Sequence, residues 1–242
     1  MASHKIYYKA FDSDMTCQRY QFSVGKSYSV DGDLSMCSNG FHICKNIIDC
    51  LNYYPRESRF CEIEIISKDY RTDGNKTLCR SIKVVREIVG DELIYLLSQD
   101  YERLYEDGQV EYRCSYIDGK REGKLEAFHK GGQPDYHCFY KGGEKEGESI
   151  KLYPDGQIWY RYNYKNGKLD GDQKEWYPNE QLSSQNCFRD GKLNGDQKSW
   201  YTDGQQEYHH RYRDGLYNGK QEAWKKNGEQ RYLRLYKDGD LQ

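Results

Sequence analysis

The chain has 242 residues, of which 31% are charged, 36% are hydrophobic and 15% are aromatic, with 25 tyrosines. The aromatic content excludes a disordered chain, because disordered sequences lack the rings that fill a core. The formal net charge of −2 gives no basic excess that would attract nucleic acid, so we expect no nucleic-acid partner.

The ends and the cysteines of the chain bear on its cellular location. Residues 1–6 lack the apolar core of a secretion signal, and no apolar run is long enough to cross a membrane. The nine cysteines follow no common disulfide framework, and in a reducing compartment they would be free thiols. We therefore expect a cytoplasmic protein.

The sequence of residues 1–90 predicts a small α+β domain. Short β-like runs are expected over residues 5–11, 59–66 and 81–88. A short helix is expected over residues 46–54. The candidate core residues are Phe60, Ile63, Ile65, Ile82, Val84 and Val85. Residues 91–103 contain Leu93, Ile94, Leu96 and Leu97 at helical spacing, and we interpret this segment as a helical bridge to the rest of the chain.

One cluster in this domain contains residue types that bind metals. Cys37, His42, Cys44 and Cys50 are close in sequence, but they lack the paired Cys-x-x-Cys spacing of zinc sites. Buried thiols are the better interpretation, and we expect neither a metal nor a cofactor.

Two family resemblances concern the same segment. Tyr8 to Phe11, Gln21-Phe22, Gly40 to Cys44 and Tyr53-Tyr54 resemble an uncharacterised domain of phages and large DNA viruses, which implies a viral source and no known activity. The order of elements also resembles the ADP-ribosyltransferase core. That resemblance would place Tyr8 or Lys9 at the cofactor-holding position and make Glu62 or Glu64 the acid. None of these is the residue the core requires there, and the alternative is that His42 and Glu64 are ordinary strand residues.

Residues 104–242 repeat with a period of 24 residues. Glycines recur in three columns. The first column is Gly108, Gly132, Gly156, Gly204 and Gly228, with Glu180 as its exception. The second column is unbroken and comprises Gly119, Gly143, Gly167, Gly191, Gly215 and Gly239. The third column is Gly123, Gly147, Gly171, Gly195 and Gly219. Most glycines of the first two columns follow Asp or Asn, and such dipeptides supply the positive φ angles of tight hairpin turns.

Between the turns, aromatic residues alternate with polar ones, as in half-buried strands. One ladder position holds Tyr112, Tyr136, Tyr160, Tyr208 and Tyr232. A second holds Tyr116, Tyr140, Tyr164, Phe188, Tyr212 and Tyr236. The ends of the second strands hold Phe128, Leu152, Trp176, Trp200 and Trp224. We therefore predict about six hairpin units, the last incomplete. They would form an elongated, single-layer antiparallel β-meander, in a β-dominated chain that begins with the small α+β domain.

The units resemble MORN (membrane occupation and recognition nexus) repeats of the variant type, as in YPDGQIWYRYNYKNGKLDGDQKEW at Tyr153 to Trp176. The resemblance implies a meander used for protein association, in some members for lipid contact or dimerisation, and no active site. The fourth unit departs from the pattern, since Glu180 replaces glycine and Ser184 replaces tyrosine. We expect its turn to be held less well.

The sequence thus favours a non-catalytic protein-interaction or scaffolding module that acts through the repeat sheet, by binding another protein or by self-association. If the source is viral, the role would be host interaction or assembly in the host cytoplasm. The expected partner-binding residues are Tyr112, Tyr136, Tyr160, Tyr208, Tyr232, Trp176, Trp200 and Trp224. The first alternative is an NAD-using transferase in residues 1–90. The second is a peripheral lipid-binding protein, which the near-neutral charge does not favour.

Overall fold

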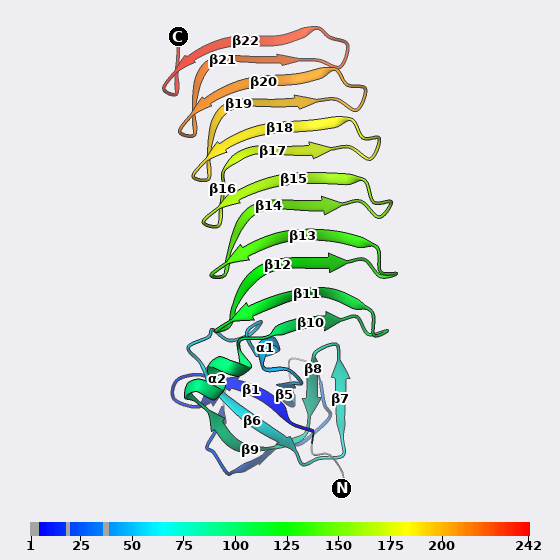
Figure 1. The fold of residues 1–242 in the computed structure, drawn as a ribbon, viewed down its shortest axis with the longest axis vertical. Helices are drawn as coiled ribbons and strands as arrows, with labels where there is room; N and C mark the ends of the chain where they lie inside the picture. Colours follow the sequence, from blue (N-terminus) through cyan, green and yellow to red (C-terminus); the bar gives the residue numbers. More distant parts are fainter. Residues whose placement is uncertain (1–4, 18–19, 36–38) are drawn as a thin grey trace. The chain divides into compact units, whose positions relative to one another are not determined.

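The computed structural model describes residues 5–17, 20–35 and 39–242, and the chain divides into two compact units, residues 1–120 and 121–242. The β-rich architecture predicted from the sequence is confirmed: open antiparallel sheets dominate both units (Figure 1). No helix among the described residues is both long and apolar enough to cross a membrane.

The first unit contains a seven-stranded antiparallel sheet with the strand order β4-β9-β6-β1-β5-β8-β7. Its strands are β1 (Tyr7–Phe11), β4 (Ser27–Ser29), β5 (Phe41–Cys44), β6 (Arg59–Ile65), β7 (Tyr70–Asp73), β8 (Lys76–Cys79) and β9 (Ser81–Ile88). A separate short pair comprises β2 (Thr16–Cys17) and β3 (Tyr20–Gln21).

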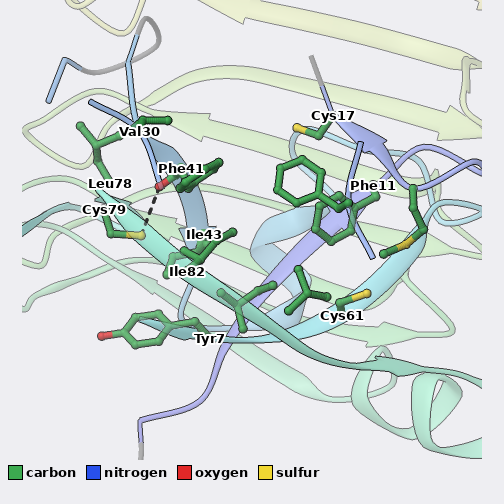
Figure 2. Packing of buried hydrophobic residues seen from close by; sticks show 14 of the residues in the cluster. Tyr7, Phe11, Cys17, Val30, Phe41, Ile43, Cys61, Leu78, Cys79 and Ile82 are labelled. Carbon is green, nitrogen blue, oxygen red and sulfur yellow. Dashed lines mark hydrogen bonds between the residues drawn. The ribbon is translucent and has the colours of Figure 1, made fainter. Parts of the chain in front are cut away.

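The core of this sheet is made by alternate residues of its strands. Phe11, Ile43, Ile63 and Ile82 are almost completely buried and pack in one cluster (Figure 2). Of the expected core residues, Phe60, Ile63, Ile82 and Val84 are buried and Ile65 packs at the margin. Val85 was wrongly placed: it is 39% exposed, because neighbouring residues of a strand point to opposite faces and Val84 occupies the buried one.

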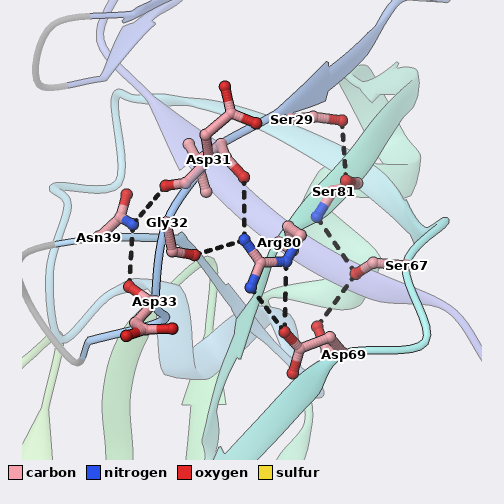
Figure 3. A network of polar contacts seen from close by, with 10 residues as sticks. Ser29, Asp31, Gly32, Asp33, Asn39, Ser67, Asp69, Arg80 and Ser81 are labelled. Atoms are coloured by element: carbon pink, nitrogen blue, oxygen red, sulfur yellow. Dashed lines mark hydrogen bonds and ion pairs between the residues drawn. The ribbon is translucent and has the colours of Figure 1, made fainter.

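Arg80 fastens the loop that precedes β5 to the rest of the first unit (Figure 3). Its guanidinium donates to the carboxylate of Asp69 at 2.8 Å and to the carbonyl oxygens of Val30 and Gly32. In the same loop the Asn39 side chain donates to two backbone carbonyls, those of Asp31 and Asp33. Because one planar cation holds several acceptors at once, residues 30–32 are held in place without regular secondary structure.

Two helices occur among the described residues of this unit. Helix α1 (Ile47–Cys50) is shorter than expected, and the Asn46 side chain accepts a hydrogen bond from the backbone N–H of Ile48 at its start. Helix α2 (Gly90–Leu96) covers the first part of residues 91–103, the segment interpreted as a helical bridge. That interpretation is wrong for the second part, where the chain forms a hairpin of β10 (Asp100–Leu104) and β11 (Val110–Ile117). The buried Asp49 of α1 accepts hydrogen bonds from Tyr101 and Asn75 and thereby holds this hairpin to the domain.

The second unit is a meander in which each strand pairs with the next along the chain, except that β15 pairs with both β16 and β17. Its strands are β12 (Lys120–Phe128), β13 (Pro134–Lys141), β14 (Glu144–Leu152), β15 (Ile158–Lys165), β16 (Lys168–Leu169), β17 (Gly171–Trp176), β18 (Leu182–Arg189), β19 (Lys192–Trp200), β20 (Gln206–Arg213), β21 (Leu216–Trp224), β22 (Gln230–Lys237) and β23 (Asp240–Leu241). Residues 121–242 contain no helix, so no second layer of this unit covers either face of its sheet.

The first two glycine columns form the turns, as predicted. In the first column, the N–H of Gly156 donates to the carbonyl of Tyr153 at 2.9 Å, and the same contact recurs in every unit. In the second column, Asn166 and Gly167 both have positive φ, at 48° and 73°, which is the geometry of a type I′ turn. The N–H of Gly167 also donates to the carbonyl of Lys145 in the preceding hairpin, at 2.9 Å. The turns of this column therefore link each hairpin to the next.

The third glycine column forms a bulge inside each hairpin. Cys138 pairs with Ser149 and Tyr140 pairs with Lys145, so three residues centred on Gly147 face the single residue Phe139. The φ of Gly147 is +73°, which favours glycine, and the same irregularity recurs in the pairs β18–β19 and β20–β21. The sequence identified this column but not the bulge.

Candidate functional site

The register of the second unit decides which side chains share a face of the sheet. Tyr160 pairs with Lys151 on one side and with Glu175 on the other, and Tyr208 pairs with Ser199 and Ala223. Directly paired residues of an antiparallel sheet point to the same face. Carried from strand to strand, this rule places on one face the residues Tyr136, Cys138, Tyr140, Tyr160, Tyr162, Tyr164, Tyr208, His210, Tyr212, Tyr232 and Tyr236. We call these residues the aromatic face.

Rings of the aromatic face pack on one another. Tyr160 and Tyr162 stack with centroids 4.3 Å apart, and Tyr208 and His210 stack at 4.6 Å. His210 also shares a 2.8 Å hydrogen bond with the hydroxyl of Tyr232 on the next hairpin. Most of these rings are half-buried, so the tyrosines predicted to bind a partner already contribute to the stability of the sheet.

The aromatic face combines half-buried phenols with cations that lie over some of its rings. Burial raises the pKa of Tyr160 to about 12 and also raises the pKa of Tyr136 and Tyr208. The Lys145 ammonium lies 4.9 Å from the centroid of the Tyr164 ring, and the Arg234 guanidinium lies 5.1 Å from that of Tyr232. The face thus presents ring surface beside positive charge.

A polar gap interrupts the aromatic face at the fourth unit. Ser184 and Asn186 of β18 occupy positions that hold aromatic residues in neighbouring units. Phe188 is the aromatic residue that β18 contributes to this face. The strand still pairs along its length, from Leu182 to Arg189. A serine at this ladder position is therefore compatible with the sheet.

The opposite face carries charges of both signs. Arg161 and Glu148 form an ion pair at 3.3 Å, and Asp196 contacts Arg211 at 2.9 Å and His209 at 3.2 Å. Large apolar side chains such as Phe139, which is 44% exposed, stand among these charges. The aromatic face thus differs from its reverse side in having its rings gathered together.

The predicted tryptophans lie elsewhere on the sheet. Trp176, Trp200 and Trp224 each end a strand, just after a shift in register, and are half-buried near the turns of the first column. Trp176 lines a shallow hollow with Ile158 and the turn at Asp155–Gln157. Tyr112 lies on β11 of the first unit, where its ring is 5.8 Å from that of Tyr101. The structure therefore gathers the tyrosines of β13, β15, β20 and β22 on one face and places the tryptophans at its margin.

Gly119 is the member of the second turn column that lies in the first unit. Its φ is +75°, and its N–H donates to the carbonyl of Leu97 at 2.9 Å. A Cβ at this position would lie 3.1 Å from the Arg56 side chain, whose guanidinium forms an ion pair with Asp118. The Gly119 turn is thus held by contacts within its own unit.

Two structural columns of the second unit escaped the sequence analysis. Gln173, Gln197 and Gln221 stand two residues after glycines of the third column and are 2% exposed. The amide of Gln173 accepts from the N–H of Asn163 at 2.7 Å and donates to its carbonyl at 3.2 Å, so it replaces the backbone partner that the bulge removes. The spacing Gly-x-Gln, three times at 24-residue intervals, is the signal that could have revealed this role.

A second overlooked column joins neighbouring hairpins. The hydroxyls of Tyr153, Tyr177 and Tyr201 donate to the backbone carbonyls of Trp176, Trp200 and Trp224, at 2.8, 2.9 and 3.0 Å. Each bond spans one repeat. These tyrosines therefore act as clamps between units.

Of the residues considered for an enzymatic role, Tyr8 and Glu62 are direct neighbours across β1 and β6. Glu62 is held by the guanidinium of Arg86 at 2.7 and 2.8 Å, and Glu64 faces Lys83 on β9. Tyr8 and Lys9 line a cavity together with His42, and neither glutamate is among the residues that line it. Among the residues the structure describes, no group of three or more potential metal ligands gathers; Cys37 lies outside the described residues.

Comparison with protein families identifies both parts of the chain. A model described as a domain of unknown function (DUF7666) matches residues 5–96, and a model described as a MORN repeat variant matches residues 145–166 and 169–190. The two repeat matches begin 24 residues apart (169 − 145 = 24), which equals the period of the glycine columns. No curated protein matches the chain. The resemblances to an uncharacterised domain and to MORN repeats of the variant type are thereby confirmed, and MORN repeats in general suggest a binding or scaffolding role.

Proposed function

The chain joins a DUF7666 domain to MORN repeats of the variant type, and we propose that it is a non-catalytic association module that binds a protein partner through the aromatic face. The observation that carries the proposal is the alignment of half-buried tyrosines on one face of a sheet that no second layer of its unit covers. Tyrosine is enriched at protein interfaces because its large ring loses little conformational entropy and its hydroxyl can still bind.

The chemistry of the face narrows the partner. Lys145 and Arg234 lie over its rings, and the carboxylate of Glu175 accepts a hydrogen bond from the hydroxyl of Tyr162. A complementary segment would offer apolar side chains to the rings and carboxylates to the cations. We expect the partner to present an acidic segment with aromatic or aliphatic residues.

The fourth unit supplies the substitution for a test. Because Ser184 occupies the tyrosine position of that unit, the double variant Tyr136→Ser and Tyr160→Ser should keep the repeat fold while it removes two adjacent rings. Tagged full-length protein would be used to capture partners from its source cells, with quantification by mass spectrometry. We expect the proteins enriched by the wild type to decrease by about tenfold or more with the double variant, as for loss of interface anchors.

A matched control comes from the opposite face. Arg161 follows Tyr160 directly and points to the charged side, where the fourth unit has Gln185. The variant Arg161→Gln should capture the same proteins as the wild type. Equal capture by all three proteins, or a loss confined to Arg161→Gln, would contradict a role for the aromatic face.

A further inference from the structure

Strands β1 and β5 are neighbours in the sheet of the first unit, yet they barely pair. Their register contains the single pair Tyr8 and Cys44, whereas β1 pairs with β6 over five residues and β5 pairs with β8 over four. Where β1 and β5 diverge, a cavity of about 200 Å³ opens. Lys9, Cys17, His42, Tyr53, Tyr54 and Lys76 are among the residues that line it.

Lys9 is the unusual residue among those that line the cavity. Its side chain lies on β1 between those of Tyr7 and Phe11, and the residue is only 6% exposed. The ammonium donates to the backbone carbonyl of His42 at 3.2 Å and lies 5.5 Å from the centroid of the Phe11 ring. Within the described residues, no carboxylate lies at ion-pair distance from it. A buried cation without a counter-ion is unfavourable, because burial removes its hydration.

Lys76 adds a second positive charge to the cavity lining, and the other polar residues there are neutral. The ammonium of Lys76 lies 4.6 Å from the centroid of the Tyr53 ring. Burial, together with Lys76 and Lys9, lowers the pKa of His42 to about 4, so this imidazole is neutral at pH 7. The hydroxyl of Tyr54 and the thiol of Cys17 are 2.8 Å apart. The cavity therefore contains two cations, several neutral polar groups and no acid among its lining residues.

We propose that this cavity binds a small anion of the carboxylate or phosphate class, whose charge serves as the counter-ion that Lys9 lacks. Pockets for drug-sized ligands usually occupy about 300–1,000 Å³, so the ligand is smaller than these. A whole dinucleotide would extend out of the cavity. The site is separate from the repeat sheet, and its ligand is independent of the protein partner proposed above.

The test uses the full-length protein, with sodium phosphate and sodium acetate as probes at constant ionic strength against sodium chloride. Thermal unfolding would be followed with increasing probe, and binding measured by calorimetry. We expect one of the two anions to raise the melting temperature of the wild type in a saturable manner, since a ligand that binds the folded state stabilises it. The anion that acts identifies the ligand class. If neither anion does more than chloride, the proposal is wrong.

Substitutions locate the effect. Lys9→Met keeps the length of the side chain and removes the charge, so we expect affinity for the active anion to fall by about tenfold or more, the equivalent of one charge-assisted hydrogen bond. Without anion, this variant should be at least as stable as the wild type. Lys76→Gln should weaken binding and keep the fold, and Lys68→Met, at an exposed position, should leave binding unchanged. If Lys9→Met and Lys76→Gln both bind the anion like the wild type, the charge of the cavity is not what binds it.

Discussion

Glu180 shows how a single backbone angle constrains the repeat. It replaces the glycine of the first column, yet its N–H still donates to the carbonyl of Tyr177 at 3.0 Å and its φ is +63°. The expectation that this turn is held less well thus has a physical basis in strain, since left-handed backbone costs a residue with a Cβ about 1–2 kcal/mol.

Replacing Glu180 by glycine should relieve this strain. Part of the gain is offset because glycine makes the unfolded chain more flexible, so we expect Glu180→Gly to raise the free energy of unfolding by about 0.5–1 kcal/mol. Urea unfolding measures this. The reverse change in the neighbouring unit, Gly156→Glu, should lower the free energy, because the φ of Gly156 is +88°. Two changes of the same sign would refute the strain argument.

His42 makes the first unit sensitive to acid. Its pKa is lowered to about 4 by burial and by Lys76 and Lys9, from an ordinary value of about 6.5. The unfolded chain therefore binds the proton more readily than the folded one. The resulting stability is fully present above about pH 6.5 and is lost as the pH falls towards about 4.

A substitution isolates this contribution. In His42→Gln, the free energy of unfolding should fall less between about pH 7 and about pH 4.5 than in the wild type. Denaturant unfolding at the two pH values measures the difference. His137→Gln, on the repeat sheet, is the control. Parallel pH dependences of the wild type and His42→Gln would contradict the lowered pKa.

At the scale of the hairpin, the buried glutamines replace backbone hydrogen bonding that the bulge disrupts. At the bulge, the Gln173 side chain accepts from the N–H of Asn163, and it donates to the Asn163 carbonyl, which also accepts from the backbone N–H of Asp170. Gln173→Leu keeps the volume but leaves the N–H of Asn163 unsatisfied, so we expect the free energy of unfolding, measured with urea, to fall by about 1–3 kcal/mol. The exposed Gln230→Leu should change stability by no more than about 0.5 kcal/mol. Equal effects of the two substitutions would show that the buried amide bonds contribute little.

The hydrogen bonds of the tyrosine clamps stabilise each hairpin against the next. Each of Tyr153→Phe, Tyr177→Phe and Tyr201→Phe removes one bond to the next unit, worth about 0.5–1.5 kcal/mol. Because the three sites share no partners, their effects in the triple variant should add, and amide exchange should quicken across β15 to β21. Tyr95→Phe, on an exposed residue, is the control. Unchanged exchange in the triple variant would contradict this coupling.

The sequence predicted the hairpins because their turns are local: an Asp-Gly or Asn-Gly pair determines its own backbone, and alternation determines which tyrosines share a face. The bulge escaped prediction because Gly147 and its equivalents lie within strands, where glycine alone does not reveal which residues it faces. The cavity between β1 and β5 escaped for a different reason. It depends on the pairing of strands distant in sequence, and Lys9 looks like any surface lysine until that pairing is known.

For the whole molecule, the two proposals assign a small anion to the first unit and a protein partner to the second. The first has a small, positively charged cavity, and the second has an extended aromatic face. The periodic contacts of the second unit extend from one hairpin to the next, as in other repeat proteins, so the face grows with the number of units. The cytoplasmic location and the viral source stay predictions from the sequence.

The most direct test of the aromatic face is photo-crosslinking with benzoylphenylalanine placed at position 160 or at position 161 of the full-length protein. These neighbouring side chains point to opposite faces of the same strand. We predict that the probe at position 160 forms covalent adducts with a protein partner in source cells, whereas the probe at position 161 does not. Adducts formed equally from both positions, or from position 161 alone, would contradict the assignment of the aromatic face as the binding surface.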